Sequence, residues 1–289
     1  GGVLRFHIRA PSPLTWNQEI GLVGGRRNHS RVSSITSGAV GSTGYFLALG
    51  WMDTDGYRAL PEAGHQSYGG ARRLNLHGRF NRPALGGELQ ASVNLLDLDA
   101  ENPGSLTREQ MADEGRIANA FNVRQRTGKA LRQGQVGLSW SGPVPGGEGS
   151  LAAWAISRDL TNPIPPAIVE LERRTGGLRG SLDGTGSRGD WEVRWRVGGE
   201  VAVQDDQREN FENEEGETGV RTLDQSEEVR TAGFFAQGML LGPGGWTLFS
   251  ALRYHRAAFQ VRDAFKGSGD PDDSGSRTMD AASPSLGVS

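Results

Sequence analysis

The stretch WEVRWRVGGEVAVQ, residues 191–204, decides the fold. Its odd positions hold the large apolar side chains, which are Trp191, Val193, Trp195, Val197, Val201 and Val203. Its even positions are mostly charged or polar. Because the side chains of a strand alternate between the two faces of a sheet, this stretch predicts a strand with one apolar and one polar face. It runs for fourteen residues, whereas an ordinary strand has about five or six.

Similar alternation recurs along the 289 residues, and 45–51 and 150–158 add stretches that are apolar on both parities or nearly so. Together they give eleven strand candidates, with a twelfth beginning at 277. Besides 191–204 they are 16–24, 31–40, 45–51, 72–80, 88–96, 132–140, 150–158, 168–182, 228–241 and 246–255. Short connections rich in glycine and proline occur at 41–44, 81–87, 141–149, 183–190 and 242–245. Glycine supplies positive φ and proline presets φ, so these segments are typical of tight hairpin turns.

The alternate connections tend to be long and polar, at 53–70, 97–129, 205–227 and 263–276, although 24–30 and 160–167 are short. Only 97–129 shows a helical signal, since Thr107 and Gln110 have the spacing of a capping box. Short turns at one end of the strands and long loops at the other predict an antiparallel up-and-down sheet.

Two all-β architectures fit such a sheet: a soluble sandwich, whose apolar face is buried, and a membrane barrel, whose apolar face is outside. The long strands favour the barrel, because a tilted strand needs about nine to eleven residues to cross a membrane. Backbone groups in lipid are satisfied only by neighbouring strands, so the sheet must close. We therefore expect an antiparallel up-and-down transmembrane β-barrel wall with about 11–12 strands.

Tryptophan placement gives a second indication. Trp16, Trp140, Trp191 and Trp246 lie at strand ends on the side of the short turns. An aromatic girdle belongs at such a membrane interface, whereas scattered core tryptophans are the alternative.

The sequence gives little support for an enzyme active site or a metal site. The chain has no cysteine, and its net charge of −3 gives no argument for nucleic acid. The segment GTGSRG (184–189) precedes a strand instead of the helix that a dinucleotide site needs. The five histidines lack zinc-binding spacing, and no nucleophile stands beside a base. We expect no catalytic residues, no metal and no cofactor, while DPDDSG (270–275) is left open between an imperfect calcium loop and a solvated loop.

The polar face of the predicted wall leaves one group of candidate ligand-binding residues. They are Arg73, Asn75, His77, Arg79, Arg194 and Arg196. Arginines inside a barrel could hold an anionic ligand or ferric complex through charge-assisted hydrogen bonds. They could equally pair with a plug or with nearby acids such as Glu192 and Glu200, and a polar lumen favours this structural role.

Several segments resemble the TonB-dependent outer-membrane receptors. GGVLRFHIRAP (1–11) is similar to the end of their plug domain, although Ile8 and Arg9 stand where a Thr-Lys/Arg pair is usual. FLALGWMDTDGYR (46–58) resembles the third barrel strand and its exit, and NPGSLTREQMAD (102–113) resembles a loop of proteobacterial members. FFAQGMLLGPGGWTLFSALRYH (234–255) and SGSRTMDAASPSLGVS (274–289) resemble later strands, with Ala251 and His255 as departures.

The resemblance implies that residues 1–12 are the end of a plug and that 13–289 form the N-terminal half of the barrel. It implies a Gram-negative outer-membrane location, contact with membrane lipid, and energy supplied by TonB, ExbB and ExbD through regions outside this chain. The function implied is non-enzymatic import of a scarce nutrient, above all a ferric siderophore. A passive porin, a soluble extracellular binding protein and an outer-membrane hydrolase are the alternatives, and the ligand itself is not identifiable.

Overall fold

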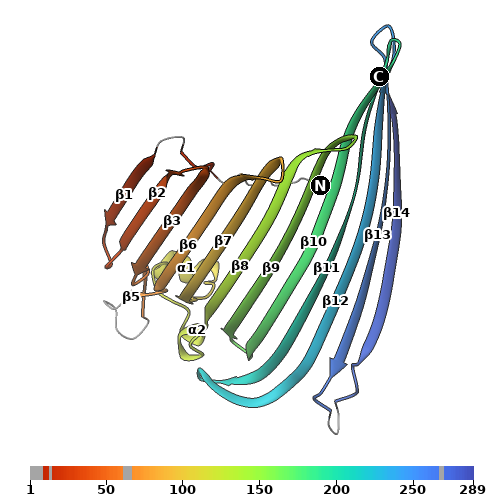
Figure 1. The fold of residues 1–289 in the computed structure, drawn as a ribbon. Coiled ribbons are helices and arrows are strands. Elements are labelled where there is room, and N and C mark those ends of the chain that lie inside the picture. Colours follow the sequence, from red (N-terminus) through yellow and green to blue (C-terminus); the bar gives the residue numbers. More distant parts are fainter. Residues whose placement is uncertain (1–8, 13–14, 61–66, 267–269) are drawn as a thin grey trace.

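The computed structural model describes residues 9–12, 15–60, 67–266 and 270–289. Twelve strands form one antiparallel sheet that curves like part of a barrel wall (Figure 1), in the order β1-β2-β3-β6-β7-β8-β9-β10-β11-β12-β13-β14. Their bounds are Trp16–Gly24, Ser30–Val40, Thr43–Thr54, Ala71–Ala84, Gly87–Glu101, Gly128–Val144, Gly147–Ile164, Ala167–Arg188, Trp191–Glu214, Glu217–Leu241, Thr247–Asp263 and Gly275–Val288. All twelve predicted strands and the up-and-down antiparallel order are confirmed, and the opening stretch lies in the ninth strand of the sheet.

The remaining elements are small and lie at the end of the sheet that carries the longer connections. They are β4 (Arg58–Ala59), β5 (Ser67–Tyr68), α1 (Arg108–Glu114) and α2 (Ala120–Arg124). The predicted capping box is confirmed, because Thr107 Oγ1 accepts from Gln110 N and the Gln110 side chain accepts from Thr107 N. No helix in the described part of the chain is long and apolar enough to cross a membrane. We call this end of the sheet the loop end, and the opposite end the turn end.

The strand register has the stagger that a barrel requires. Gly44 pairs with Asn81, but β6 runs on to Ala84 before its own turn. In the same way Glu148 pairs with Asp183, and β10 runs on to Arg188. These two turns therefore lie farther along the strand axis than the turns before them, and such shear accompanies strand tilt in a closed barrel.

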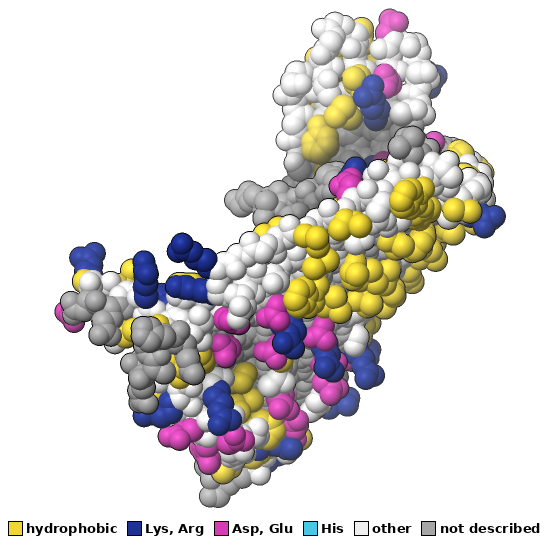
Figure 2. All heavy atoms as spheres, turned by 90° about the vertical axis from the view of Figure 1, so that its left-hand side faces the viewer, with side chains coloured by type: hydrophobic (Ala, Val, Ile, Leu, Met, Phe, Trp, Pro, Cys, Tyr) yellow, Lys and Arg dark blue, Asp and Glu magenta, His cyan; other side chains and the backbone are white. Residues whose placement is uncertain are grey.

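Apolar side chains lie exposed on one face of the sheet. The residues of this apolar face include Leu138, Leu151, Leu178, Val193, Val201, Val203, Phe234 and Leu252, all of them exposed. No second sheet covers them in the described part of the chain, so the sandwich alternative is contradicted. Figure 2 shows the resulting apolar band with charged side chains gathered along its border.

The border follows the register of the strands. Beyond the exposed apolar residues toward the loop end, each of the strands β7 to β13 has a first charged residue on this face. These residues are Asp97, Arg132, Asp159, Arg174, Asp205, Arg230 and Arg256. Because a charged side chain on a lipid-facing wall is costly at the bilayer centre and cheap at its edge, this sequence of residues marks one limit of the band.

Tryptophans mark the other limit, as expected from the sequence. Trp191 and Trp246 pack edge to face with ring centroids 5.4 Å apart and an interplanar angle of 88°. Trp140 Nε1 donates to the carbonyl oxygen of Ala84 at 3.1 Å. Trp16 begins β1 and is exposed. Four of the seven tryptophans thus lie at or near the turn end.

The expectation of a long polar loop over 205–227 is wrong. β11 continues to Glu214 and β12 begins at Glu217. The turn between them has φ of 56° at Glu215 and 90° at Gly216, values typical of a tight hairpin turn of type I′. The periodic signal fades here because the hairpin extends past the apolar band, where neither face has to be apolar, while its backbone hydrogen bonds continue.

Candidate ligand-binding wall

All six predicted ligand-binding residues lie on the polar face of the sheet, but in two separate groups. Arg73, Asn75, His77 and Arg79 belong to β6, and Arg194 and Arg196 belong to β11. Four strands lie between β6 and β11, so the groups are about 24 Å apart at a strand spacing of about 4.8 Å. The structure therefore does not assemble them into one site.

The β6 group forms a polar network with its neighbours. The His77 ring contacts the Asn94 side-chain oxygen through Nδ1 and packs against Phe46 with centroids 5.9 Å apart. Arg79 Nε donates to Asn81 Oδ1 at 2.8 Å, and Asn81 Nδ2 donates to Glu88 Oε1 at 2.6 Å. His77 Nε2 is buried and has no hydrogen-bond partner among the described residues. A buried polar atom of this kind needs a partner from water or from another segment.

The β11 group is paired within the sheet. Arg194 Nε lies 2.5 Å from Glu192 Oε1, and Arg196 Nε lies 3.1 Å from Asp183 Oδ1. Asp183 takes the place that the sequence suggested for Glu200, because Asp183 is directly opposite Arg196 in the register. These pairs satisfy the two guanidinium groups locally, and their part in ligand binding stays a prediction.

A third polar group on this face lies nearer the loop end and was missed from the sequence. Arg173 binds Asp206 with two hydrogen bonds, from Nε to Oδ1 at 2.8 Å and from Nη2 to Oδ2 at 2.5 Å. Asp206 is only 3% exposed and also accepts from Gln204 Nε2 at 3.1 Å. On the adjacent β9, Arg158 donates to Gln133 Oε1. The sequence signal for this group was weak, because charged residues occupy both even and odd positions of 168–174, so alternation does not assign them to one face.

Contacts between segments that are far apart in the chain connect the loops at the loop end. Asn213 near the tip of β11 donates to the carbonyl oxygens of Gln125 and Ile164, both at 2.9 Å, and accepts from Gly216 N at 2.7 Å. Arg126 forms an ion pair with Glu217 at 2.7 Å. The β11–β12 hairpin therefore braces the segment that carries α1 and α2.

The β4–β5 connection joins the same assembly. Ala59 N donates to Arg116 O at 2.7 Å, and Ala118 N donates back to Ala59 O at 2.8 Å. Burial raises the pKa of the nearby Tyr68 hydroxyl, and the negative charge of Glu101 raises it further. Glu101 is held in place because it accepts from Gly69 N and Gly70 N, both at 2.9 Å.

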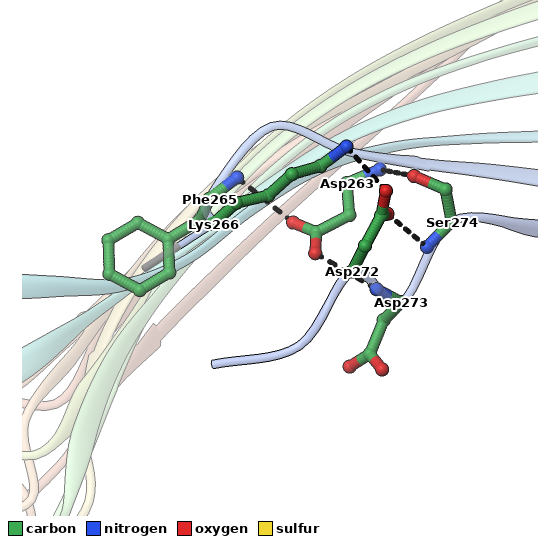
Figure 3. A network of polar contacts seen from close by, with 6 residues as sticks. All are labelled: Asp263, Phe265, Lys266, Asp272, Asp273 and Ser274. Carbon is green, nitrogen blue, oxygen red and sulfur yellow. Dashed lines mark hydrogen bonds and ion pairs between the residues drawn. The ribbon is translucent and has the colours of Figure 1, made fainter. Parts of the chain in front are cut away.

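The DPDDSG segment forms a hydrogen-bonded loop of its own (Figure 3). Asp272 accepts from Lys266 Nζ at 2.7 Å and from Ser274 N at 2.9 Å. Asp263 accepts from Phe265 N and Asp273 N. The Lys266 ammonium, followed by Ser274, lowers the pKa of Asp272 well below its ordinary 3.8. In the described part of the chain, no three histidine or acidic side chains are grouped to hold a metal.

Comparison with known proteins connects this wall to a class of structures. No protein-family model matches the sequence, and no curated protein matches it significantly. The structure is nevertheless similar to the unliganded ferric citrate transporter FecA, with a TM-score of 0.77 at 13% identity, over 97% of this chain and 42% of that one. The chain thus has part of the barrel fold seen in this transporter.

Further solved structures share this receptor-barrel fold. The alcaligin outer-membrane receptor FauA from Bordetella pertussis has a TM-score of 0.70 at 9% identity, over 97% of this chain and 41% of its own. The ferric yersiniabactin uptake receptor FyuA from Yersinia pestis has a TM-score of 0.68 at 14% identity, over 97% and 45%. The predicted resemblance is thus confirmed for the fold, and the chain spans less than half the length of these receptors.

Proposed function

We propose that this chain is the N-terminal half of the barrel of a Gram-negative outer-membrane receptor that imports a ferric siderophore or a related iron complex. The observation that carries the proposal is a receptor-barrel sheet whose exposed face is apolar and whose other face is lined with paired arginines and amides. Such a wall has lipid outside and water inside. The turn end is then periplasmic, and the loop end is extracellular.

The division into plug and barrel is part of the same proposal. Residues 1–8, which carry most of the plug-like segment, lie outside the described residues. The described part supports the division, because Ser12 N donates to Ser37 Oγ at 2.6 Å and Arg9 pairs with Glu19 at 2.9 Å. Ser37 and Glu19 belong to the polar face, so the chain enters the barrel wall from the lumen side.

Transport requires a ligand affinity that changes between two states of the receptor. We propose that the full-length protein obtains the energy for this change from TonB with ExbB and ExbD. In the lumen wall, Arg73 is exposed and forms no ion pair with any described residue. It is therefore the member of the predicted group best able to attract an anionic iron complex, whereas Arg194 and Arg196 stabilise the wall.

The test is uptake of radiolabelled iron by cells that lack the full-length gene. A panel of ferric siderophores and ferric citrate is supplied with and without TonB. We expect loss of uptake of one iron complex on deletion of the gene, and the same loss on deletion of TonB. Uptake that persists without TonB would indicate a passive pore, and unchanged uptake of every complex would contradict the proposal.

Within this assay Arg73→Gln is expected to weaken uptake at low concentrations of the complex. Arg132→Gln removes the same charge from the apolar-face border and serves as the matched control. Equal uptake by the two variants would remove Arg73 from the ligand path while leaving the receptor function intact.

A further inference from the structure

A groove crosses the apolar face of the wall over β9 to β13. It has a volume of about 450 Å³, and its apolar-face lining is Leu151, Leu178, Gly180, Gly199, Val201, Ala232, Phe234, Tyr254 and Arg256. Gly180 and Gly199 pair directly across β10 and β11. Because neither has a side chain, they form a floor between the exposed side chains of Leu178 and Val201 on one side and Phe234 on the other.

The register gives the groove its direction. Gly180 pairs with Gly199, and Ala232 on the next strand pairs with Arg256, so the small residues of the lining lead diagonally from β10 to Arg256 on β13. Leu151, Phe234 and Tyr254 are exposed and border this path. The path crosses four strands, so it spans roughly 14 Å at about 4.8 Å per spacing. One leaflet of a bilayer has about 15 Å of hydrocarbon, and a single acyl chain therefore fits along the path.

The two ends of the groove differ in chemistry. Leu151 lies near the turn end of β9, which begins at Gly147. Arg256 follows Tyr254 on β13 and is the first charged residue on this face toward the loop end. Since tilted strands carry a row diagonally through a membrane, the groove runs through the apolar band and ends at its charged border.

Arg256 is available to a ligand. It forms no ion pair within the described part of the chain, although Asp280 lies opposite it on β14. Its planar guanidinium offers donors in a fork that matches phosphate oxygens. The exposed Tyr254 beside it adds a hydroxyl donor.

We infer that this groove binds a phosphorylated glycerolipid at the loop end of the apolar band, with an acyl chain over Gly180 and Gly199 and its phosphate at Arg256 and Tyr254. An apolar channel with one cationic end is complementary to an anionic amphiphile. A free phosphate would leave the channel empty, and a neutral lipid would bring no phosphate oxygens to the guanidinium. The site is separate from the lumen wall and does not depend on which iron complex is carried.

The test is lipid titration of the purified full-length protein in detergent, with bound lipid counted by native mass spectrometry. The probes are phosphatidylglycerol, diacylglycerol with the same chains, and glycerol phosphate. Phosphatidylglycerol is expected to bind at least about ten-fold more tightly than diacylglycerol, the scale of one charge-assisted hydrogen bond, and glycerol phosphate is expected not to bind.

Matched variants separate this site from ordinary lipid contact. In Gly180→Leu the new Cβ meets only Ser150 O at 3.6 Å and Leu151 Cδ1 at 3.7 Å, so the side chain fits and fills the groove. Gly134→Leu is the control, because its Cβ meets only Leu95 Cδ2 at 3.6 Å on the same face outside the groove. Arg256→Gln removes the charge, and Arg132→Gln is its control at the border.

We expect Arg256→Gln to weaken phosphatidylglycerol binding about ten-fold, the scale of one charge-assisted contact. Gly180→Leu is expected to weaken it to a similar extent because the new side chain occupies the space of the acyl chain, and both controls are expected to leave it unchanged. Equal binding by all four variants would show that lipid covers the wall without a specific site and would overturn the inference. So would equal binding of phosphatidylglycerol and diacylglycerol. The inference rests on the proposed membrane wall but not on transport, so neither result would affect the iron-uptake test.

Discussion

The apolar face is expected to meet lipid and not water, and Val136 on β8 tests this prediction. Val136 lies in the middle of the apolar set of its strand, paired with Val93 and Ala155. Its side chain is 55% exposed. If this face met water, Val136→Arg would change stability by no more than about 0.5 kcal/mol, as at other exposed positions. If it meets lipid, the same change costs about 2–4 kcal/mol near the bilayer centre.

The adjacent residue supplies the control. Gln135 lies on the polar face, so Gln135→Arg places the same guanidinium in the wet lumen and is expected to cost less than about 0.5 kcal/mol. The full-length protein would be folded into lipid vesicles and unfolded with urea, with tryptophan fluorescence as the signal. A stability loss confined to Val136→Arg supports the membrane barrel. Equal stability of the two variants would refute the assignment of the apolar face to lipid.

Three further predictions concern the lumen wall and the loop end. Asp206→Ala should lower the free energy of unfolding in urea by about 2–3 kcal/mol, because it leaves the partly buried Arg173 without its two hydrogen bonds. A decrease below about 0.5 kcal/mol would show that the ion pair is dispensable. Asn213→Ala should speed protease cleavage of segment 102–127 without changing urea unfolding of the barrel, since the side chain joins that segment to the hairpin; an unchanged cleavage rate would contradict this bracing role. Because the pKa of Asp272 is lowered in the folded loop, its contribution to loop order is present above the ordinary pKa of 3.8 and is lost only as the pH falls through the lower folded value. Amide exchange should therefore show a protected loop at pH 4, and Lys266→Met should move the loss of protection to higher pH.

Much of the fold could be predicted from local pattern. Period-two alternation located most of the twelve strands, because a wall between lipid and water alternates along its strands, and apolar runs located those at 45–51 and 150–158. Turn glycines located the hairpins, and Thr107 with Gln110 located the first helix. The same rule failed over 205–227, because both faces of this hairpin meet water and the polarity of its residues therefore does not alternate.

The candidate site was less predictable. Alternation placed Arg73, His77 and Arg196 on the polar face correctly, but it could not give their partners. Arg196 pairs with Asp183 because the β10–β11 register sets the two residues opposite each other. A shift of register by one residue would turn every side chain to the other face, so cross-strand partners depend on turn length and stagger as well as on residue type.

The sequence by itself therefore determined which side chains face each way, since a strand alternates whatever its neighbours are. Only the tertiary structure decided which residues meet across strands: Arg173 with Asp206, Asn213 with the α1–α2 segment, and Gly180 with Gly199 in the lipid-facing groove. These contacts join residues far apart in the chain. Their physical cause is the strand register, which the length of each turn and the stagger between neighbouring strands set together.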